Sequence, residues 1–525
     1  MRARMSSKLF VGGVASLGLL LASAACGGAD PSPAGEAPVP DAGNADTSSG
    51  GNPDDDGGTA PTLPADTLAE GDVILNGLAG DDAIYIDLGQ NSLHAVPIAG
   101  GAAVKIADLT DDSTFEISGG AVAVWTGITG TGAATLGTLN VWTRATGYKT
   151  AVATSSRPGS FFAASDDGSR IAFSQGIVVD ADKLTSVPIG VRDTAAGTNA
   201  VTLTDANAIN FAADDCPPAM GFAGKVFFAQ FCTGTDESAT DARLVTVAAT
   251  GTTVDRLDAA AADPGTLKPG TFSPDDTGTK VFAIASANSA GKVFTIGGAA
   301  ATFETDIELG VMLPDGSAVI FQTTAGALKK ATAVEAPVVT TLAPSIKGLL
   351  ALAPNGKNLI FHVGELEETD HPELYAQLDL HALDPSAATP APTALVPSST
   401  AFPASYNGAA THFLFFGDIT ETSAKLKSIP IGGGTAKDVA DTDTVFPAET
   451  GTDVVFTTNP QEVGPTDEEF VTFDLKHVDS VAGGAAELVA LGVPSGETMI
   501  KGKRVVYSRV NAQGKGIGIF GATLP

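Results

Sequence analysis

The chain has 525 residues, with 60 acidic and 29 basic side chains, and its formal net charge is −31 at pH 7. Such a polyanion is repelled by nucleic acid and by anionic lipid surfaces, because affinity for phosphate depends on Lys and Arg displacing counterions. Apolar residues make up 43% of the sequence, too much for a wholly disordered chain. The 61 Gly and 31 Pro, with 6% aromatic residues, favour many short strands joined by turns.

The first residues carry the features of a secretory signal peptide. Three basic side chains within the first eight residues precede an apolar run over residues 9–22, and small residues at 23–25 lead into Cys26. A charged start, a short apolar core and a small-residue cleavage site define such a signal. The apolar run is too short and too interrupted by glycine for a comfortable transmembrane helix.

The segment Leu21–Cys26 resembles a bacterial lipoprotein signal, which implies that residues 1–25 are removed and that Cys26 carries the lipid. One position departs from the family pattern, because Ser23 stands where Leu is usual. The alternative is ordinary cleavage just before the cysteine, which leaves a free thiol. Gly27 after the cysteine implies the outer membrane of a bacterial cell envelope, on its periplasmic or its surface side.

Residues 26–70 follow as the lipidated cysteine and a tether rich in Gly, Pro and Asp. From Gly27 to Leu68 the chain has no Lys or Arg and almost no large apolar residue. Such a segment cannot bury enough apolar surface to offset its ordering entropy, so we expect it to be disordered, with a reach of roughly 35 Å. The run Asp54–Gly58 lacks the ligand spacing of an EF-hand and fits a solvated linker.

A repeated motif organises the rest of the chain: a Pro/Asp/Asn-Gly turn followed by a β-branched run that ends in an aromatic residue. Pro presets the turn, Asp or Asn accepts local backbone bonds, and Gly supplies a positive φ. The copies recur roughly every 40 to 55 residues, which is the period of a four-stranded propeller blade. The clearest copies are residues 165–173, 273–282, 313–321 and 353–361, and looser ones end near Phe228, Phe416, Phe456 and Tyr507.

A second motif places an apolar-Pro-Ile run before a glycine-rich turn. It occurs at residues 96–101 and 429–434, and in a shorter form at 187–190. Proline cannot donate to a strand ladder, so these strands should have a free or irregular side. Trp125 and Trp142 lie in strand-like runs, and we expect them to pack within blades rather than to form a ligand platform.

The Pro-Asp-Gly turns resemble the WD40-like repeats of TolB-type β-propellers, most specifically at residues 314–321 and 354–361. The resemblance covers residues 71–525 and implies an all-β fold of four-stranded blades around a channel, without implying an activity. The repeats number nine or ten, but single propellers typically have four to eight blades. We therefore expect one ring of about eight blades, with a larger ring or two rings as alternatives. A strand at Gly71–Asn76 is expected to complete the last blade.

Two cysteines remain beyond Cys26. Cys216 and Cys232 are an even number in an oxidising compartment, which favours a disulfide. A bridge across about 15 residues would stabilise the fold by roughly 3 kcal/mol in the loop-entropy model. The alternative is two buried thiols, because the strand-like run at residues 224–231 could hold them apart.

Motifs that carry chemistry are sparse. We find no Gly-x-Ser-x-Gly elbow, Walker loop, Cys-x-x-Cys pair or His-Glu-x-x-His helix, and we expect no catalytic residue and no cofactor. His362, His371 and His381, with acidic residues at 365–373, could ligate a divalent metal. A solvated acidic loop is the favoured alternative, so no metal is expected. Residues 80–82 are similar to one turn of a calcium-binding Gly-Asp repeat, but they stand alone.

The favoured function is a lipid-anchored, non-catalytic propeller that acts as a binding or scaffold module in the cell envelope. We expect a monomer, held to the membrane by its lipid, with a protein partner whose identity the sequence does not reveal. One alternative is a propeller enzyme or carbohydrate-binding protein that uses acidic pairs at the channel mouth. The other is a TolB-like translocation component, which requires an α/β domain that residues 27–70 cannot build.

Overall fold

The computed structural model describes residues 63–525 apart from several short segments. These segments are residues 160, 177, 181–182, 196–200, 204–218, 234–240, 251–253, 257–266, 269, 299, 364–376, 388, 420–423 and 465–469. The predicted signal peptide, Cys26 and most of the predicted tether therefore lie outside the described residues, as do Cys216 and His371.

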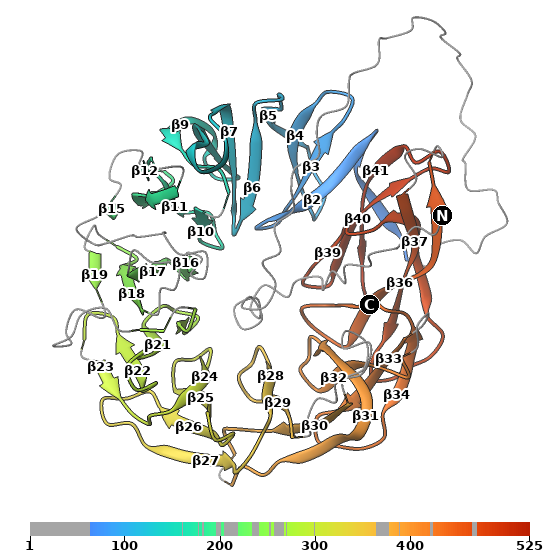
Figure 1. Ribbon diagram of the computed structural model, residues 1–525. Coiled ribbons are helices and arrows are strands. Elements are labelled where there is room, and N and C mark those ends of the chain that lie inside the picture. The colour runs from blue at the N-terminus through green and yellow to red at the C-terminus, as the bar shows by residue number, and fades with distance from the viewer. Residues whose placement is uncertain are drawn as a thin grey trace, which may run out of the picture.

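Ten antiparallel blades form one ring (Figure 1). Eight are separate four-stranded sheets, and one seven-stranded sheet supplies two more. The expectation of about eight blades is therefore wrong, whereas the all-β fold and the four-stranded blade are confirmed. In the first nine blades the strands follow one another in chain order from the inner strand, at the centre of the ring, to the outer strand at its rim, whereas the outer strand of blade 10 comes from the N-terminus.

The first five blades occupy the N-terminal half of the ring. Between the second and third strands of blade 3, a small hairpin is inserted, formed by β12 (Val178–Asp180) and β13 (Lys183–Ser186). Blade 1 consists of β2 (Val73–Ala79), β3 (Asp82–Asp87), β4 (Ser92–Pro97) and β5 (Val104–Asp108), and blade 2 of β6 (Thr114–Ser118), β7 (Ala121–Thr129), β8 (Leu136–Thr143) and β9 (Gly147–Ser156). Blade 3 consists of β10 (Phe162–Ala164), β11 (Arg170–Ser174), β14 (Ile189–Asp193) and β15 (Val201–Leu203), and blade 4 of β16 (Ala219–Ala223), β17 (Val226–Thr233), β18 (Asp241–Val247) and β19 (Val254–Arg256). Blade 5 consists of β20 (Ser273–Pro274), β21 (Lys280–Ile284), β22 (Gly291–Thr295) and β23 (Ala300–Thr302).

The last five blades complete the ring. Blades 7 and 8 share the 14-residue strand β31, which pairs with β30 along its first part and with β32 along its second. Blade 6 consists of β24 (Ile307–Met312), β25 (Ala318–Thr323), β26 (Leu328–Thr332) and β27 (Val339–Ala343). Blade 7 consists of β28 (Gly348–Leu352), β29 (Leu359–His362), β30 (Gln377–Leu383) and the first part of β31 (Thr393–Tyr406), and blade 8 of the second part of β31 with β32 (His412–Gly417), β33 (Lys425–Pro430) and β34 (Lys437–Asp441). Blade 9 consists of β35 (Phe446–Pro447), β36 (Asp453–Val463), β37 (Phe470–Asp479) and β38 (Glu487–Pro494), and blade 10 of β39 (Thr498–Lys501), β40 (Arg504–Val510), β41 (Gly516–Thr523) and β1 (Ala65–Glu70).

The Pro-Asp-Gly turns connect the inner strand of a blade to its second strand, and the strand predicted after each turn is this second strand. In blade 6, Gly316 has a φ of 65°, a left-handed conformation that glycine adopts without strain. Its N–H donates to the carbonyl of Leu313 at 2.9 Å, and the Asp315 carboxylate accepts from the Ser317 N–H at 2.9 Å. The turn is thus closed by the two types of bond that the motif anticipates.

The aromatic residue that ends each repeat lies in a second strand, in the core between neighbouring blades. Phe282 and Phe321 come from blades 5 and 6, are fully buried, and both contact Phe303. Burial of each such side chain contributes roughly 1.5–3 kcal/mol. Trp125 and Trp142 are also buried, in the cores on either side of blade 2, so their predicted packing role is confirmed.

The N-terminal strand closes the ring, but it begins earlier than the sequence indicates. β1 pairs antiparallel with β41 and becomes the outer strand of blade 10. Its Asp66 carboxylate accepts from Arg504 at 2.7 Å. Closure by an N-terminal strand is therefore confirmed, whereas the predicted strand at Gly71–Asn76 overlaps the inner strand of blade 1 instead. The propeller accordingly starts at Ala65 rather than at residue 71.

Helices contribute almost nothing to the described part of the chain. Its helical element is the single 3-10 turn η1 (Gly132–Ala134). Within residues 63–525, where described, no helix has the length and apolar character needed to span a membrane.

Candidate functional site

The inner strands carry large apolar side chains that are only half buried. By contrast, all six residues of β25, a second strand, are buried. Side chains of an inner strand point alternately toward its two neighbouring blades, and no further strand covers them on the central side. We call these residues the inner wall: Ile74, Leu78, Phe115, Ile117, Met220, Phe222, Leu309, Val311, Leu349, Leu350, Phe402, Phe446, Met499 and Ile500.

The inner wall extends around most of the ring, since its residues come from eight of the ten blades. The inner strands that carry them surround the centre of the ring (Figure 1). Apolar side chains that stay partly exposed along one surface can form a contact surface for a partner or ligand. The inner wall is therefore a candidate binding surface in the described part of the chain.

One carboxyl group lies within this apolar wall. Glu116 is on β6, between Phe115 and Ile117, which pack into the core toward blade 1. The Glu116 side chain alternates to the other face, and its Oε2 atom is buried without a hydrogen-bond partner among the described residues. Burial raises its pKa from the ordinary 4.5 to about 7. A carboxyl in this state can hold or release a proton near neutral pH.

A second buried carboxyl, Glu497, lies where the last blade meets the first. Its Oε2 accepts from the backbone N–H of Leu75 at 3.3 Å and also from the hydroxyl of Ser508. Burial raises the pKa of Glu497, and these two bonds oppose the shift. The bond to Ser508 holds the Glu497 carboxyl within blade 10, and the bond to Leu75 joins it to blade 1. We therefore assign this carboxyl to closure of the ring.

A polar cluster in blade 9 escaped the sequence analysis. His477 on β37 is buried, with Asp453 Oδ1 at 3.8 Å from Nδ1 and Glu487 Oε2 at 3.6 Å from Nε2. Neither ring nitrogen has a hydrogen-bond partner among the described residues. The two carboxylates lie next to different ring nitrogens of the imidazole, so the three side chains do not converge on one point. Three separate strands bring these residues together, so no local pattern could reveal them.

Two of the three histidines considered as metal ligands are described, and they point to opposite faces of their sheet. Phe361 and His381 are register partners on β29 and β30, so their side chains share one face, and the rings stack at 5.6 Å. His362 follows Phe361 and therefore points to the opposite face. His371 lies outside the described residues. Within the part of the chain that the structure describes, no group of three His, Cys, Asp or Glu side chains could hold a metal ion.

The predicted lipid and disulfide residues stay predictions. Cys26 and Cys216 are outside the described residues, and Cys232 is placed by its backbone on β17. Its strand pairs with β16 and β18, and Ala242 is its register partner on β18.

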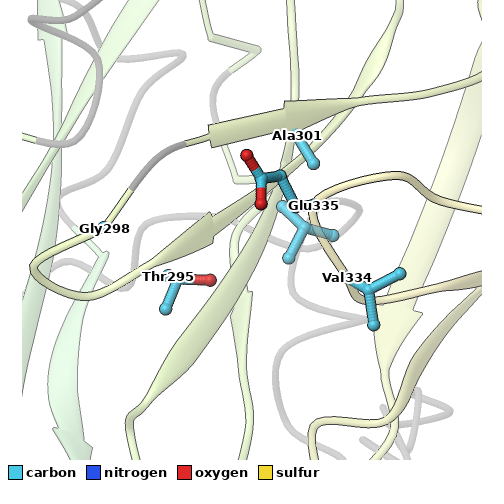
Figure 2. Close-up of a pocket in the computed structure, with 6 residues that line it drawn as sticks. Thr295, Gly298, Ala301, Val334 and Glu335 are labelled. Atoms are coloured by element: carbon cyan, nitrogen blue, oxygen red, sulfur yellow. The ribbon is translucent and has the colours of Figure 1, made fainter.

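A cavity of about 380 Å³ opens at the outer rim between blades 5 and 6. It lies between the hairpin that joins β22 to β23 and the hairpin that joins β26 to β27, and Figure 2 shows its lining side chains. The lining is mainly apolar, with one carboxylate: Val293, Thr295, Gly298, Ala301, Val334 and Glu335.

The ring, its sequential four-stranded blades and its closing strand define the chain as a β-propeller protein. No family model matches the sequence, and no curated protein matches it. Solved structures with a similar fold include tricorn protease, at 11% identity and a TM-score of 0.32, covering 87% of this chain and 61% of that chain. The chain thus spans less than two thirds of tricorn protease.

Two further similar structures are propellers of other proteins. A putative TolB from Agrobacterium tumefaciens is 12% identical, with a TM-score of 0.26, covering 52% of this chain and 94% of that one. The β-propeller domain of the Trilobed protease from Pyrococcus furiosus is 10% identical, with a TM-score of 0.32, covering 58% and 94%. Similarity at this level bears on the fold and carries no information about activity.

Proposed function

We propose that this protein is a lipid-anchored, non-catalytic propeller of the bacterial cell envelope that binds a protein partner at its inner wall. The observation that supports this function best is the inner wall itself, with half-buried apolar residues from eight blades. An apolar segment of a partner would bury this surface and gain roughly 25 cal/mol for each Å² removed from water.

The proposed anchor follows from the order of segments along the chain. Cys26 follows a signal-like N-terminus, and the first strand of the ring begins at Ala65. The segment between them is rich in Gly, Pro and Asp, and as a flexible coil it has a reach of roughly 35 Å. The ring is therefore held near the membrane, at the outer membrane in our proposal, while staying free to meet a partner.

Replacement of the anchoring cysteine tests the location. We expect Cys26→Ser to move the protein from the membrane fraction to the soluble fraction and to remove the mass of the lipid from the mature chain. Cys232→Ser, on β17, serves as the control and should stay with the membrane. Retention of the Cys26→Ser protein in the membrane fraction would refute the lipid anchor.

Site-specific crosslinking tests the binding surface. A photoreactive residue in place of Leu350, on the inner wall, should give discrete crosslinked products in intact cell envelopes. The same residue in place of Leu88 is the matched control, because Leu88 is exposed on a loop of blade 1, outside the inner wall. The absence of products at position 350, or identical products at both positions, would count against binding at the inner wall.

One observation favours an enzyme as the second candidate function. Glu116 has a pKa of about 7, which suits a general acid near neutral pH. Asp276 is a second candidate acid, in the turn between the inner and second strands of blade 5. Burial and the nearby charges of Asp275 and Asp166 raise its pKa. An assay with glycoside and peptide substrates decides: turnover that Glu116→Gln abolishes would favour the enzyme, and our proposal expects none.

A further inference from the structure

Exposed large apolar side chains are concentrated on one hairpin of blade 6. In the described part of the chain, six such side chains are well exposed, and three of them belong to the hairpin of β26 and β27: Val334 at 51% and Val338 at 64% in the turn, and Val339 at 37% at the start of β27. The other three are spread over blades 1 and 2. Across the hairpin, the Thr332 N–H donates to the carbonyl of Val338 at 3.1 Å, and the Val338 N–H donates to the hydroxyl of Thr332 at 2.8 Å. The Ala333 N–H donates to the carbonyl of Ser317 at 2.9 Å. The exposed valines are therefore held on an ordered turn.

The hairpin borders the cavity of about 380 Å³ between blades 5 and 6 (Figure 2). Val293, which belongs to the core between these blades, lines the cavity, and so does Val334. Val339 is the register partner of Ala331, which lies in the same core, so Val339 projects on the same face of the sheet. The cavity, Val334 and Val339 thus lie on the side of blade 6 that faces blade 5, at the rim of the ring, and the volume of the cavity suits a few side chains.

The outer edge of β27 adjoins this surface. β27 is the last strand of its sheet, and no described strand pairs with its outer side. Val339, Thr340 and Thr341 are all exposed there. An edge strand of this kind offers backbone N–H and C=O groups to a segment that adds itself to the sheet.

Charge identifies the partner. Glu335 is the charged residue in the lining of the cavity, and the whole chain carries −31. A second copy of this acidic chain would be repelled, whereas a basic side chain would be attracted. The apolar lining and the open edge require in addition that the partner be extended and carry apolar side chains.

We propose that the hairpin Ala333–Val338, the cavity beside it and the edge of β27 bind an extended segment of a partner protein in which apolar and basic residues alternate. The backbone of the segment pairs with β27. Its apolar side chains cover Val334 and Val338, and a basic side chain approaches Glu335. This rim site is separate from the inner wall, so the two can be tested independently.

Binding of labelled peptides to the purified full-length protein tests this site. The probe is a fluorescent octapeptide of alternating valine and lysine, with a serine–lysine and a valine–glutamate octapeptide as controls. We expect saturable binding of the valine–lysine peptide at about 100 µM or below, and much weaker binding of both controls. The absence of saturable binding would overturn the proposal. Equal binding of the serine–lysine peptide would also overturn it, because binding would then depend on charge and not on apolar side chains.

Variants assign the binding to the hairpin. Glu335→Lys and Val334→Asp should each weaken binding by at least about tenfold, and Leu88→Asp, an exposed position on blade 1, should leave it unchanged. All three positions are exposed, and matching melting temperatures will show that the variants fold. Binding that survives both hairpin variants contradicts the proposal. So does a dimer in sedimentation that Val338→Asp converts to monomer, since a second copy would then occupy the site.

Discussion

In several blades, a charged first residue of the second strand bonds to the next blade. In blade 5 this residue is Lys280, whose Nζ donates to the carbonyl of Gly316 at 2.9 Å and to that of Ala333 at 2.7 Å. Gly316 lies in the inner turn of blade 6 and Ala333 in its outer hairpin. One ammonium group therefore joins both turns of the neighbouring blade.

The first residue of the second strand also contacts the next blade in blades 3 and 1. Arg170, in blade 3, donates from Nη1 to the carbonyls of Lys225 and Ala248 in the two turns of blade 4. Blade 1 reverses the polarity: the position is occupied by Asp82, whose carboxylate accepts from Arg144 of blade 2 at 3.0 Å. These are charge-assisted bonds in partly buried surroundings, which makes them stronger than ordinary surface contacts.

Loss of one such contact should be measurable in the stability of the protein. Lys280→Met keeps much of the apolar stem but removes both donors, and we expect the free energy of unfolding to fall by about 1–3 kcal/mol. The control is Lys357→Met, at an exposed position in the inner turn of blade 7, and it should change stability far less. Denaturant titration compares the two, and equal effects would mean that the contact with blade 6 contributes nothing.

Glu116 should make stability depend on pH. Its folded-state pKa of about 7 lies above the ordinary 4.5, so the folded protein retains the proton while the unfolded chain loses it. The stabilising contribution is therefore complete below about pH 4.5 and is lost as the pH rises through about 7. We expect Glu116→Gln to raise the melting temperature at pH 8 and to have little effect at pH 4.5.

The exposed Glu462 supplies the control for this titration, because Glu462→Gln should leave the pH dependence of melting unchanged. Equal gains from Glu116→Gln at pH 4.5 and at pH 8 would show that the carboxyl does not titrate as described.

At the scale of strands and turns, short sequence patterns predict the turns and the buried residues of the strands that follow them. Phe321 and Phe361 end clear Pro/Asn-Gly repeats, and both are buried on second strands, where the repeat places them. From its sequence, the run at residues 80–82 stands alone as a Gly-Asp motif, yet in the structure it joins the first two strands of blade 1. Its repeat lacks proline, so its similarity to the other copies emerges only from the fold.

Contacts between blades could not be predicted from the sequence. Arg170 and Ala248 lie in neighbouring blades and are 78 residues apart, and even within blade 9 His477 and its two carboxylates come from three different strands. No spacing rule links such pairs, because their approach depends on the angle and distance between whole sheets. For the same reason the inner wall became visible only when the inner strands were placed around a common centre.

Close approach of neighbouring turns gives a prediction at this scale. A Cβ atom added at Gly120 would lie 2.5 Å from the Gly168 nitrogen and 2.7 Å from the Asp166 oxygen, both backbone atoms of blade 3. Gly120→Ala should therefore separate blades 2 and 3 and destabilise the protein by about 1–3 kcal/mol. Gly432→Ala, where a Cβ meets no atom within 4 Å, is the control in thermal melts. Similar melting of both variants would contradict the tight packing.

At the scale of the whole molecule, the number of blades shows where the sequence argument failed. Nine or ten repeats can be counted along the chain, and the structure has ten blades. The lower expectation came from the usual size of propellers rather than from these residues. Every additional blade widens the ring, because each sheet packs only against its two neighbours, and the repeats alone do not limit their own number.

Closure of the ring gives the last prediction. A chain that begins at residue 72 lacks β1 and its pairing with β41, whereas a chain that begins at residue 63 keeps both. We expect the shorter chain to melt at a clearly lower temperature, because blade 10 loses its outer strand and the Asp66–Arg504 contact. Identical melting curves for the two chains would show that the outer strand does not hold the ring together.

The position of β1 also gives the ring a defined polarity. Ala65 pairs with Ala522, and the neighbouring Leu524 donates its N–H to the carbonyl of Lys503 in the inner turn of blade 10. The chain upstream therefore joins the molecule on the face formed by the Pro-Asp-Gly turns. A tether from a membrane anchor at Cys26 would therefore enter the ring on this face, and the opposite face, built from the loops that lead into the inner strands, would stay clear of the point where the tether joins.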